Sequence, residues 1–186
     1  MNLGEFACYT GLINILYHDE LNDLIVRTST IKDLLIIDKL LKENINAVGF
    51  IPKTYFEKAV WNGEKNAIVL ICEANADPVG YVYITPGKNF GYAKIQQIAV
   101  RNDARRLQYG TALISVCKKF CKKFYRNGFT LRCRTDLESN FFWESLGFKK
   151  YGVWEKGRYN PMSRLIASDD INLWKIELND TILTLF

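Results

Sequence analysis

The sequence predicts a single α/β (α+β) domain, and three observations support this prediction. At 186 residues, with 48% hydrophobic and 24% charged residues, the chain is long enough to bury a full core. Apolar residues recur at strand-like and helix-like intervals in alternation along the chain. No internal repeat or low-complexity linker interrupts this alternation. We expect residues 24–186 to form the domain, and residues 1–23 to be an extension packed on it as an extra helix or an arm.

The first half of the domain is predicted to contain a strand, two helices and three strands. Ser29 or Thr30 is a suitable N-cap for the first helix, and Pro52 begins the second. Turn residues at 75–78 separate two apolar runs, which predicts an antiparallel hairpin. We expect strands at residues 24–29, 66–74, 78–85 and 92–100, and helices at residues 31–44 and 52–63.

The second half is predicted to continue with a helix, a strand, a short helix and a last strand. The long helix lies between Arg105 and Arg126, and its buried face includes Cys117 and Cys121, which we expect to be core residues. Gly147 ends the short helix. We expect strands at residues 129–135 and 171–178, a helix at residues 137–147, and a loop between two late strands at residues 160–163.

Composition narrows the classes of protein that the chain can belong to. No apolar run approaches the roughly 18–20 residues that a membrane span needs, and the N-terminus lacks a basic region before its apolar stretch, so we expect neither a span nor secretion. The five cysteines lack C-x-x-C spacing, which argues against a zinc site and fits a reducing cytoplasm. They are Cys8, Cys72, Cys117, Cys121 and Cys133.

Positive charge is concentrated in one segment of a chain whose net charge is +5. Between Arg101 and Arg126 there are eight Lys or Arg residues against one acid, Asp103, so this segment should attract a polyanion. The lysines of the segment also fit the solvated face of a helix, and this alternative stays open.

Residues 101–113, "RNDARRLQYGTAL", join the strand at 92–100 to the long helix through a turn that contains Gly110. The first backbone N–H groups of a helix have no intrahelical partner, and together with the helix dipole they attract an anion. Arg105 and Arg106 can donate charge-assisted hydrogen bonds to the same anion. The turn is therefore a candidate phosphate site.

Two stretches carry a resemblance to a known family. "IAVRNDARRLQYGTALI" resembles the coenzyme-A-binding signature of the GNAT acyltransferases, with Arg105 and Gly110 in place and Gln108 where the family has its first glycine. "LESNFFWESLGF" resembles the penultimate helix of the family and its Gly-Phe turn, with Trp143 where many members carry a tyrosine. The resemblance covers about residues 24–178.

The resemblance implies the GNAT fold, in which a mixed central sheet, flanked by helices, is splayed to form an acyl-CoA cleft. The cleft would lie between the strands at 92–100 and 129–135, with acetyl-CoA as cosubstrate. Because a glutamine replaces the glycine, we expect an ordinary backbone conformation at Gln108. The residues implied in cofactor binding are Ile98, Val100, Arg105, Arg106, Gln108, Tyr109, Gly110 and Thr111.

The acid and base of the family are replaced in this sequence. Many members use a glutamate as base at the position of Gln97, which cannot take a proton, and Trp143 cannot supply one to the departing thiolate. We keep Gln97, Trp143 and Ser139 as catalytic candidates. Weaker substitutes are Glu73, Asp136, Glu138 and Tyr109, while His18 is expected to be a surface residue.

Three functions are compatible with these observations. The first is an acetyltransferase acting on a primary amine of a small molecule or a protein. The second is a Mom-like enzyme of the same superfamily that modifies nucleic-acid bases, which the basic segment favours. The third is a non-catalytic module that binds acyl-CoA. No metal and no membrane are expected as partners.

Overall fold

The computed structural model describes most of the chain. Its strands are β1 (Ile15–Asp19), β2 (Leu24–Thr28), β3 (Ile68–Ala74), β4 (Asp77–Pro86), β5 (Tyr92–Val100), β6 (Gly128–Arg134), β7 (Lys149–Trp154), β8 (Tyr159–Asn160), β9 (Leu165–Ile166) and β10 (Ile171–Glu177). Its α-helices are α1 (Leu34–Val48), α2 (Lys53–Trp61), α3 (Tyr109–Cys121) and α4 (Ser139–Ser145). The described residues are 15–19, 23–61, 67–88, 91–121, 127–157, 159–160, 165–166 and 169–178.

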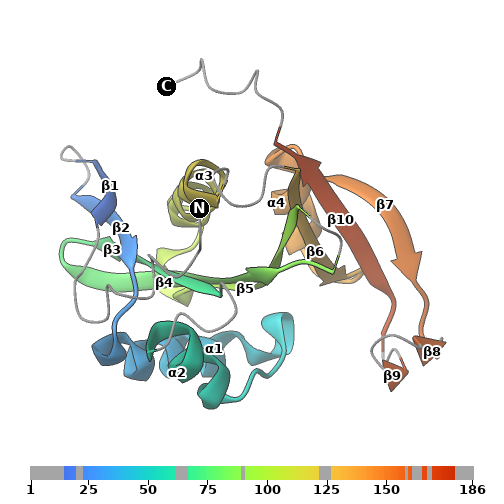
Figure 1. The fold of residues 1–186 in the computed structure, drawn as a ribbon, viewed down its shortest axis with the longest axis horizontal. Coiled ribbons are helices and arrows are strands. Elements are labelled where there is room, and N and C mark those ends of the chain that lie inside the picture. The colour runs from blue at the N-terminus through green and yellow to red at the C-terminus, as the bar shows by residue number, and fades with distance from the viewer. Residues whose placement is uncertain are drawn as a thin grey trace.

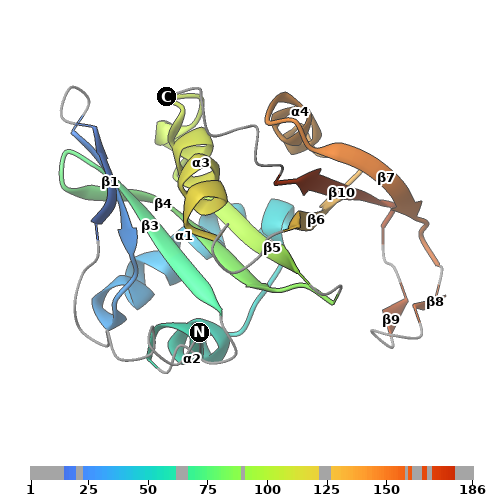
Figure 2. The same ribbon diagram turned by 45° about the horizontal axis from the view of Figure 1, so that its top comes forward.

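Within the described residues, eight strands form one mixed sheet in the order β1-β2-β3-β4-β5-β6-β10-β7, and β8 pairs with β9 in a separate two-stranded sheet. α1 and α2 cover one face of the β2–β5 half, and α3 covers the other (Figure 1). α4 packs on β6 on the same side as α3 (Figure 2). The expected mixed sheet flanked by helices is confirmed.

Two apolar clusters hold these layers together. On the α3 face, Leu113 packs with Leu70 and Val82, all of which are fully buried. On the α1 face, Ile37 and Leu40 of the helix pack against buried side chains of the sheet. Because successive strand residues point to opposite faces, each of the central strands contributes to both clusters.

The sheet divides between β5 and β6. These parallel strands pair only where Tyr92–Lys94 lies beside Gly128–Thr130, and beyond Lys94 they separate. A Cβ atom on Gly128 would lie 1.9 Å from the carbonyl oxygen of Ile176, so only glycine lets β6 start this close to β10. The separation produces the expected splayed sheet.

Several expected boundaries shift in the structure. The first helix begins as a 3-10 turn (Ile31–Asp33) capped by Thr30, and α1 then extends to Val48. The long helix begins at Tyr109 rather than near Arg105, because a 3-10 turn (Asn102–Ala104) and the phosphate-site turn come first. Cys117 is buried as expected, whereas the side chain of Cys121 lies outside the described residues.

The ends of the domain differ from expectation in a second way. Part of the predicted extension, β1, is an antiparallel partner of β2 at the edge of the sheet. The boundary at residue 23 stays a prediction, and residues 1–14 lie outside the described part, as do 62–66, 122–126 and most of the expected 160–163 loop. β7 is the one described strand of more than two residues between α4 and the expected 160–163 loop, where a late strand was predicted without bounds. No described helix is both long and apolar enough to cross a membrane.

Candidate functional site

A cleft of about 690 Å³ opens where β5 and β6 separate. One wall is β5 and the turn that leads into α3, the other is β6 with α4, and the last turns of α1 contribute a third side. Each cofactor or catalytic residue in the predicted set lines this cleft: Gln97, Ile98, Val100, Arg105, Arg106, Gln108, Tyr109, Gly110, Thr111, Ser139 and Trp143. Their roles remain predictions.

A β-bulge changes the direction of side chains on the β5 wall. Tyr83 pairs with Gln97 and Ile84 pairs with Ile95, so Gln96 is an extra residue with no partner across β4. The Gln96 amide donates to the hydroxyl of Thr85 over 2.8 Å. The bulge therefore places Gln97 on the α1 face and leaves Ile98 facing the α3 side.

The turn before α3 presents backbone donors to the cleft. The carbonyl of Gln108 accepts the first helical bond, from the N–H of Ala112 at 2.9 Å. The N–H groups of Tyr109, Gly110 and Thr111 thus belong to the first turn, where no intrahelical acceptor exists. A Cβ atom on Gly110 would lie 3.2 Å from the Phe142 ring, so glycine lets α3 approach α4.

The backbone of the turn corrects one expectation. Arg106 has φ +64° and Gln108 has φ +66°, both in the left-handed region that favours glycine. The expected ordinary conformation at Gln108 is therefore wrong. The backbone has the conformation that a glycine would adopt, and the Cβ atom of the glutamine makes this conformation sterically unfavourable.

The two arginines of the turn reach different walls. Nη2 of Arg105 donates to Oδ1 of Asn44 on α1 over 2.6 Å, and Nδ2 of Asn44 in turn donates to the carbonyl of Leu40. The Arg106 guanidinium lies 3.8 Å from the carboxylate of Glu138, beside α4, and both side chains are exposed. That both bind a single anion stays a prediction.

The side chain of Gln97 is hydrogen-bonded to the C-terminal end of α1. Its Oε1 accepts from the Tyr81 hydroxyl at 3.0 Å, and its Nε2 donates to the carbonyls of Val48 at 3.2 Å and Gly49 at 2.8 Å. The side chain is 3% exposed. From the other wall, Nη1 of Arg134 donates to the carbonyl of Asn46. These contacts are those of a structural residue, and a catalytic role for Gln97 stays a prediction.

Trp143 and Ser139 surround a thiol at the α4 wall. Trp143 is buried, with its ring centroid 5.0 Å from that of Phe142 and 5.3 Å from that of Phe148. Oγ of Ser139 lies 3.2 Å from Sγ of Cys133. Burial raises the pKa of the Cys133 thiol, so this sulfur is protonated at neutral pH and is a poor nucleophile.

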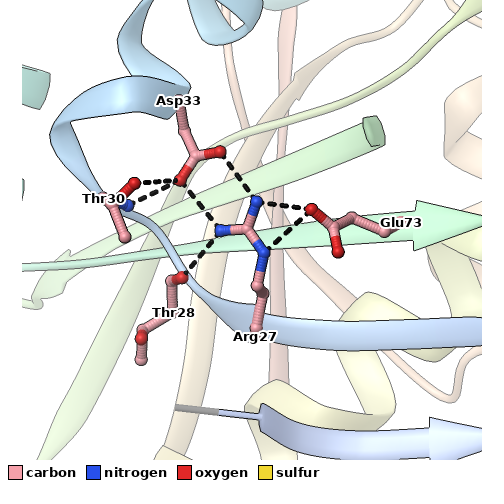
Figure 3. A network of polar contacts seen from close by, with 5 residues as sticks. All are labelled: Arg27, Thr28, Thr30, Asp33 and Glu73. Atoms are coloured by element: carbon pink, nitrogen blue, oxygen red, sulfur yellow. Dashed lines mark hydrogen bonds and ion pairs between the residues drawn. The ribbon is translucent and has the colours of Figure 1, made fainter. Parts of the chain in front are cut away.

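The weaker substitutes are dispersed. Glu73 does not line the cleft and instead binds Arg27, whose Nε lies 2.9 Å from its carboxylate (Figure 3). Asp136 is exposed and paired with Arg134 at 2.8 Å. Glu138 and Tyr109 line the cleft, and His18 is exposed on β1 as expected.

Sequence reasoning missed the contribution of α1 and of Asn140. Asn140 donates to the carbonyls of Arg134 and Leu137 at 2.7 Å, and its Oδ1 accepts from Asn172 and from the Trp174 indole. It thereby fixes the start of α4 to β6 and β10. An asparagine in a polar stretch gives no sequence signal for this role, since its partners are distant backbone and side-chain groups.

Residues 65–150 match the family model of the acetyltransferase (GNAT) domain, as the resemblance predicted. No curated protein matches the sequence significantly. The similar solved structures include the ribosomal-protein-S18-alanine N-acetyltransferase from Escherichia coli, with TM-score 0.65, 17% identity and coverage of 88% of this chain and 99% of that one.

Two further solved structures are similar to this chain. Ard1 from Thermoplasma volcanium has TM-score 0.68 and 17% identity, and the match covers 84% of this chain and 99% of that one. The yncA protein from Salmonella typhimurium, solved with its cofactor acetyl-CoA, has TM-score 0.68 and 13% identity over 84% of this chain and 95% of that one. At these identities, the likeness establishes the fold.

Proposed function

We propose that this chain, whose residues 65–150 are a GNAT acetyltransferase domain, transfers an acetyl group from acetyl-CoA to a primary amine of a small molecule or a protein. The observation that carries the proposal is the cleft between β5 and β6, with the first N–H groups of α3 on its wall. The positively charged N-terminus of a helix suits a pyrophosphate, and the apolar cleft beside it suits an extended arm such as that of coenzyme A.

The two walls suggest how the cosubstrate lies. Beyond Lys94, β5 keeps β4 as a partner through Ile98 and Val100, while its edge toward β6 is left without a strand among the described residues. The amides of the pantetheine arm would pair with this edge. The pyrophosphate would accept hydrogen bonds from the N–H groups of residues 109–111 and from Arg105, once that side chain leaves Asn44.

The cleft offers little acid–base chemistry of its own. Among the described residues that line it, Glu138 is the one carboxylate, and it is 91% exposed. The amine nitrogen would attack the thioester carbonyl and lose a proton to water, the C–S bond would break, and the CoA thiolate would take a proton. We assign that proton to the hydroxyl of Tyr109 or Ser139 or to water, and we expect the acceptor amine to arrive neutral or to lose its proton to water.

Two other functions remain candidates for the same cleft. The basic segment from Arg101 onward favours a nucleic-acid acceptor. The lack of an enclosed base and acid favours a module that binds acyl-CoA without turnover. Cys72, Cys117 and Cys133 form no disulfide, which suits a reducing compartment, so we propose the cytoplasm as the location.

Acetyl-CoA incubations with pools of amines, peptides and DNA, read by mass spectrometry, test the proposal. Peptides with free N-termini belong in the pool because a similar structure is a ribosomal-protein N-acetyltransferase. An acetylated amine or peptide supports the proposal, and acetylated DNA supports the second candidate. Calorimetric binding of acetyl-CoA without any product supports the non-catalytic module, and absence of binding excludes all three.

A further inference from the structure

Where β5 and β6 begin to separate, a place we call the fork, Lys94 and Arg132 lie on the face of the sheet that α3 does not cover, and Lys88 lies close enough for its charge to act on Lys94. Lys94 is the last β5 residue paired with β6, and Arg132 follows Thr130, a residue of this pairing, along β6. Ala93 and Ile95, on either side of Lys94, are buried in the α3-face cluster, so Lys94 points to the opposite face. Lys88 precedes β5 on the adjoining loop.

These cations repel one another, and no carboxylate among the described residues is paired with them. Burial, together with the nearby positive charges of Arg132 and Lys88, lowers the pKa of Lys94 to about 8. Among the described residues, no hydrogen bond or ion pair joins Lys88, Lys94 or Arg132 to an acidic group. A partly buried cation without a counter-ion is costly, and an anion bound there would relieve that cost.

Glu177, Lys175 and Arg134, which also belong to this part of the sheet, have partners within the protein. Glu177 accepts from the Tyr92 hydroxyl at 2.6 Å and lies 3.1 Å from Lys175. Arg134 is paired with Asp136. Neither carboxylate is therefore available to neutralise Lys94, and the three cations form the unmatched charge of the fork.

Arg132 connects this charge to the cleft. Its side chain lines the cleft, and its guanidinium lies 5.0 Å from the centroid of the Trp154 ring on β7. The contact fixes the guanidinium on an aromatic face while its edge N–H groups stay free for a planar or tetrahedral anion. Arg132 is exposed, so a ligand can reach it from solvent.

We propose that this cluster, Lys88, Lys94 and Arg132, binds a carboxylate or phosphate group carried by the acceptor amine. The inference rests on the proposed function, because it assigns the acceptor class of the same cleft. The acceptor would be an acidic small molecule, anchored by its anion at the fork while its amine reaches toward the thioester near Ile98. An acceptor of this class gains both orientation and selectivity from one ionic contact.

Matched amine pairs test the proposal on the full chain. The carboxylate arm compares 5-aminopentanoate with 5-aminopentanamide, and the phosphate arm compares O-phosphoethanolamine with ethanolamine. Each is titrated into 15N-labelled protein while the indole N–H signal of Trp154, assigned through Trp154→Phe, is followed by NMR. The same titrations use Lys94→Met/Arg132→Met and, as a control that removes a single surface lysine, Lys39→Met on the exposed face of α1.

We expect at least one anionic amine to move the Trp154 signal saturably, while its neutral partner does not. The double variant should bind that amine at least about tenfold more weakly, whereas Lys39→Met binds like the wild type. The 15N spectra of all three forms should have the same dispersion, which shows that the double variant is folded. Where turnover is seen, kcat/KM for the anionic member should fall by the same factor.

Equal shifts for charged and neutral amines, or no shift with either anion, would overturn the proposal. A shift produced only by a single-stranded oligonucleotide would also overturn it, since the cluster would then contact a nucleic-acid backbone. The titration needs no turnover, so a protein that never releases CoA refutes the proposed enzyme while the anion site is still decided.

Discussion

Gln97 donates both hydrogens of its side-chain amide to the carbonyls that end α1, a pattern that a glutamate cannot reproduce. In Gln97→Glu, a buried carboxylate would face two carbonyl oxygens, and one oxygen would lie where a donor is needed. We expect a loss of about 2–4 kcal/mol in the free energy of unfolding at pH 7, since each unpaired buried polar group costs about 1–3 kcal/mol. Urea denaturation measures the loss.

The pH dependence of this variant has a definite sign. Two effects would raise the folded-state pKa of the new carboxyl above its ordinary value of about 4.3. Burial disfavours the charged form, and the protonated acid can donate a hydrogen bond to one carbonyl. The protonated form is then fully stabilised below the unfolded pKa, and stability is lost as pH rises through the folded pKa. Gln96→Glu, which changes one bond to a threonine hydroxyl, is the control and should show a smaller loss. Equal losses at pH 4 and pH 7 would contradict this account.

Gln108 permits a second prediction at single-residue scale, because its φ of +66° is a glycine-like conformation. Gln108→Gly removes the Cβ cost of about 1–2 kcal/mol but adds about 0.4–1 kcal/mol of unfolded-chain entropy. The net change should be a stabilisation of about 0–1.6 kcal/mol in urea denaturation. Leu107→Gly is the control, since its φ is not positive, and it should be destabilising. A large loss in Gln108→Gly would mean that the glutamine side chain carries unrecognised contacts.

The backbone angle of Gln108 also marks what the sequence could not provide. The order of residue types predicted the strand, the turn and the helix, because these depend on local periodicity. The sign of φ at residues 106 and 108 depends on how α3 is held against α4, and Gly110 with Phe142 fixes that distance. A glutamine in place of the family glycine therefore misled the local prediction.

Between elements, one buried ionic network joins β2, β3 and the start of α1 (Figure 3). Arg27 binds Asp33 through two nitrogens at 2.8 Å and also binds Glu73, and Asp33 accepts the N–H of Thr30 at 2.6 Å. Arg27 and Asp33 are buried. The network fixes the entry of α1 over the sheet, and α1 in turn forms a side of the cleft.

Asp33→Asn should weaken this junction. Removing one partner of a buried pair costs about 3–5 kcal/mol, and the remaining contact to Glu73 places the expected loss near the lower end of that range, as measured by thermal or urea unfolding. Asp38→Asn, which removes the exposed Asp38–Lys42 pair at 2.7 Å, is the matched control and should cost under about 0.5 kcal/mol. Similar losses in the two variants would show that the network contributes no more than a surface pair.

Low pH should remove the stabilisation that the Asp33 carboxylate contributes to the folded state. Burial opposes the charged form of Asp33, but hydrogen bonds from Arg27 and Thr30 outweigh it and hold its pKa below the ordinary value. A lowered folded-state pKa means that the stabilisation is present above the unfolded pKa of about 3.9 and is lost as pH falls through the folded pKa. The difference between wild type and Asp33→Asn should therefore shrink below about pH 4.

Among the elements, the strands for which the sequence pattern provided no bounds, β1 and β7, are at the edges. β7 has the burial pattern of a mostly exposed strand, with Lys149, Lys150 and Tyr151 open to solvent, and β1 is equally exposed. Neither has the apolar alternation that predicted β3 to β5, because an edge strand buries little on either face. Their pairing depends on β10 and β2, whose positions follow only from the whole fold.

For the whole molecule, the two halves of the sheet are joined by a short parallel contact and a few side-chain bridges. Beyond Tyr92–Lys94, the side-chain contacts between the halves include Arg134 to the Asn46 carbonyl, Arg106 to Glu138, and the Nζ of Lys118 to the Leu146 carbonyl at 2.9 Å. The motifs predicted which two strands form the cleft. The bridges could not be predicted, since each joins residues that are distant in sequence and carry no pattern.

Acetyl-CoA should therefore stabilise the whole molecule by connecting its halves. A ligand that binds only the folded state at 100 times its Kd adds about 2.7 kcal/mol, so saturating acetyl-CoA should raise the Tm measurably. Because it would bridge β5 and β6, amide hydrogen exchange should slow on both strands and on the first turn of α3, while α2, distant from the cleft, should not change. Arg105→Ala/Arg106→Ala should lower the affinity for acetyl-CoA by more than about tenfold and reduce the Tm shift accordingly. Protection confined to one half of the sheet, or an unchanged affinity in the double variant, would mean that the cosubstrate does not lie across the fork on the arginine-bearing turn.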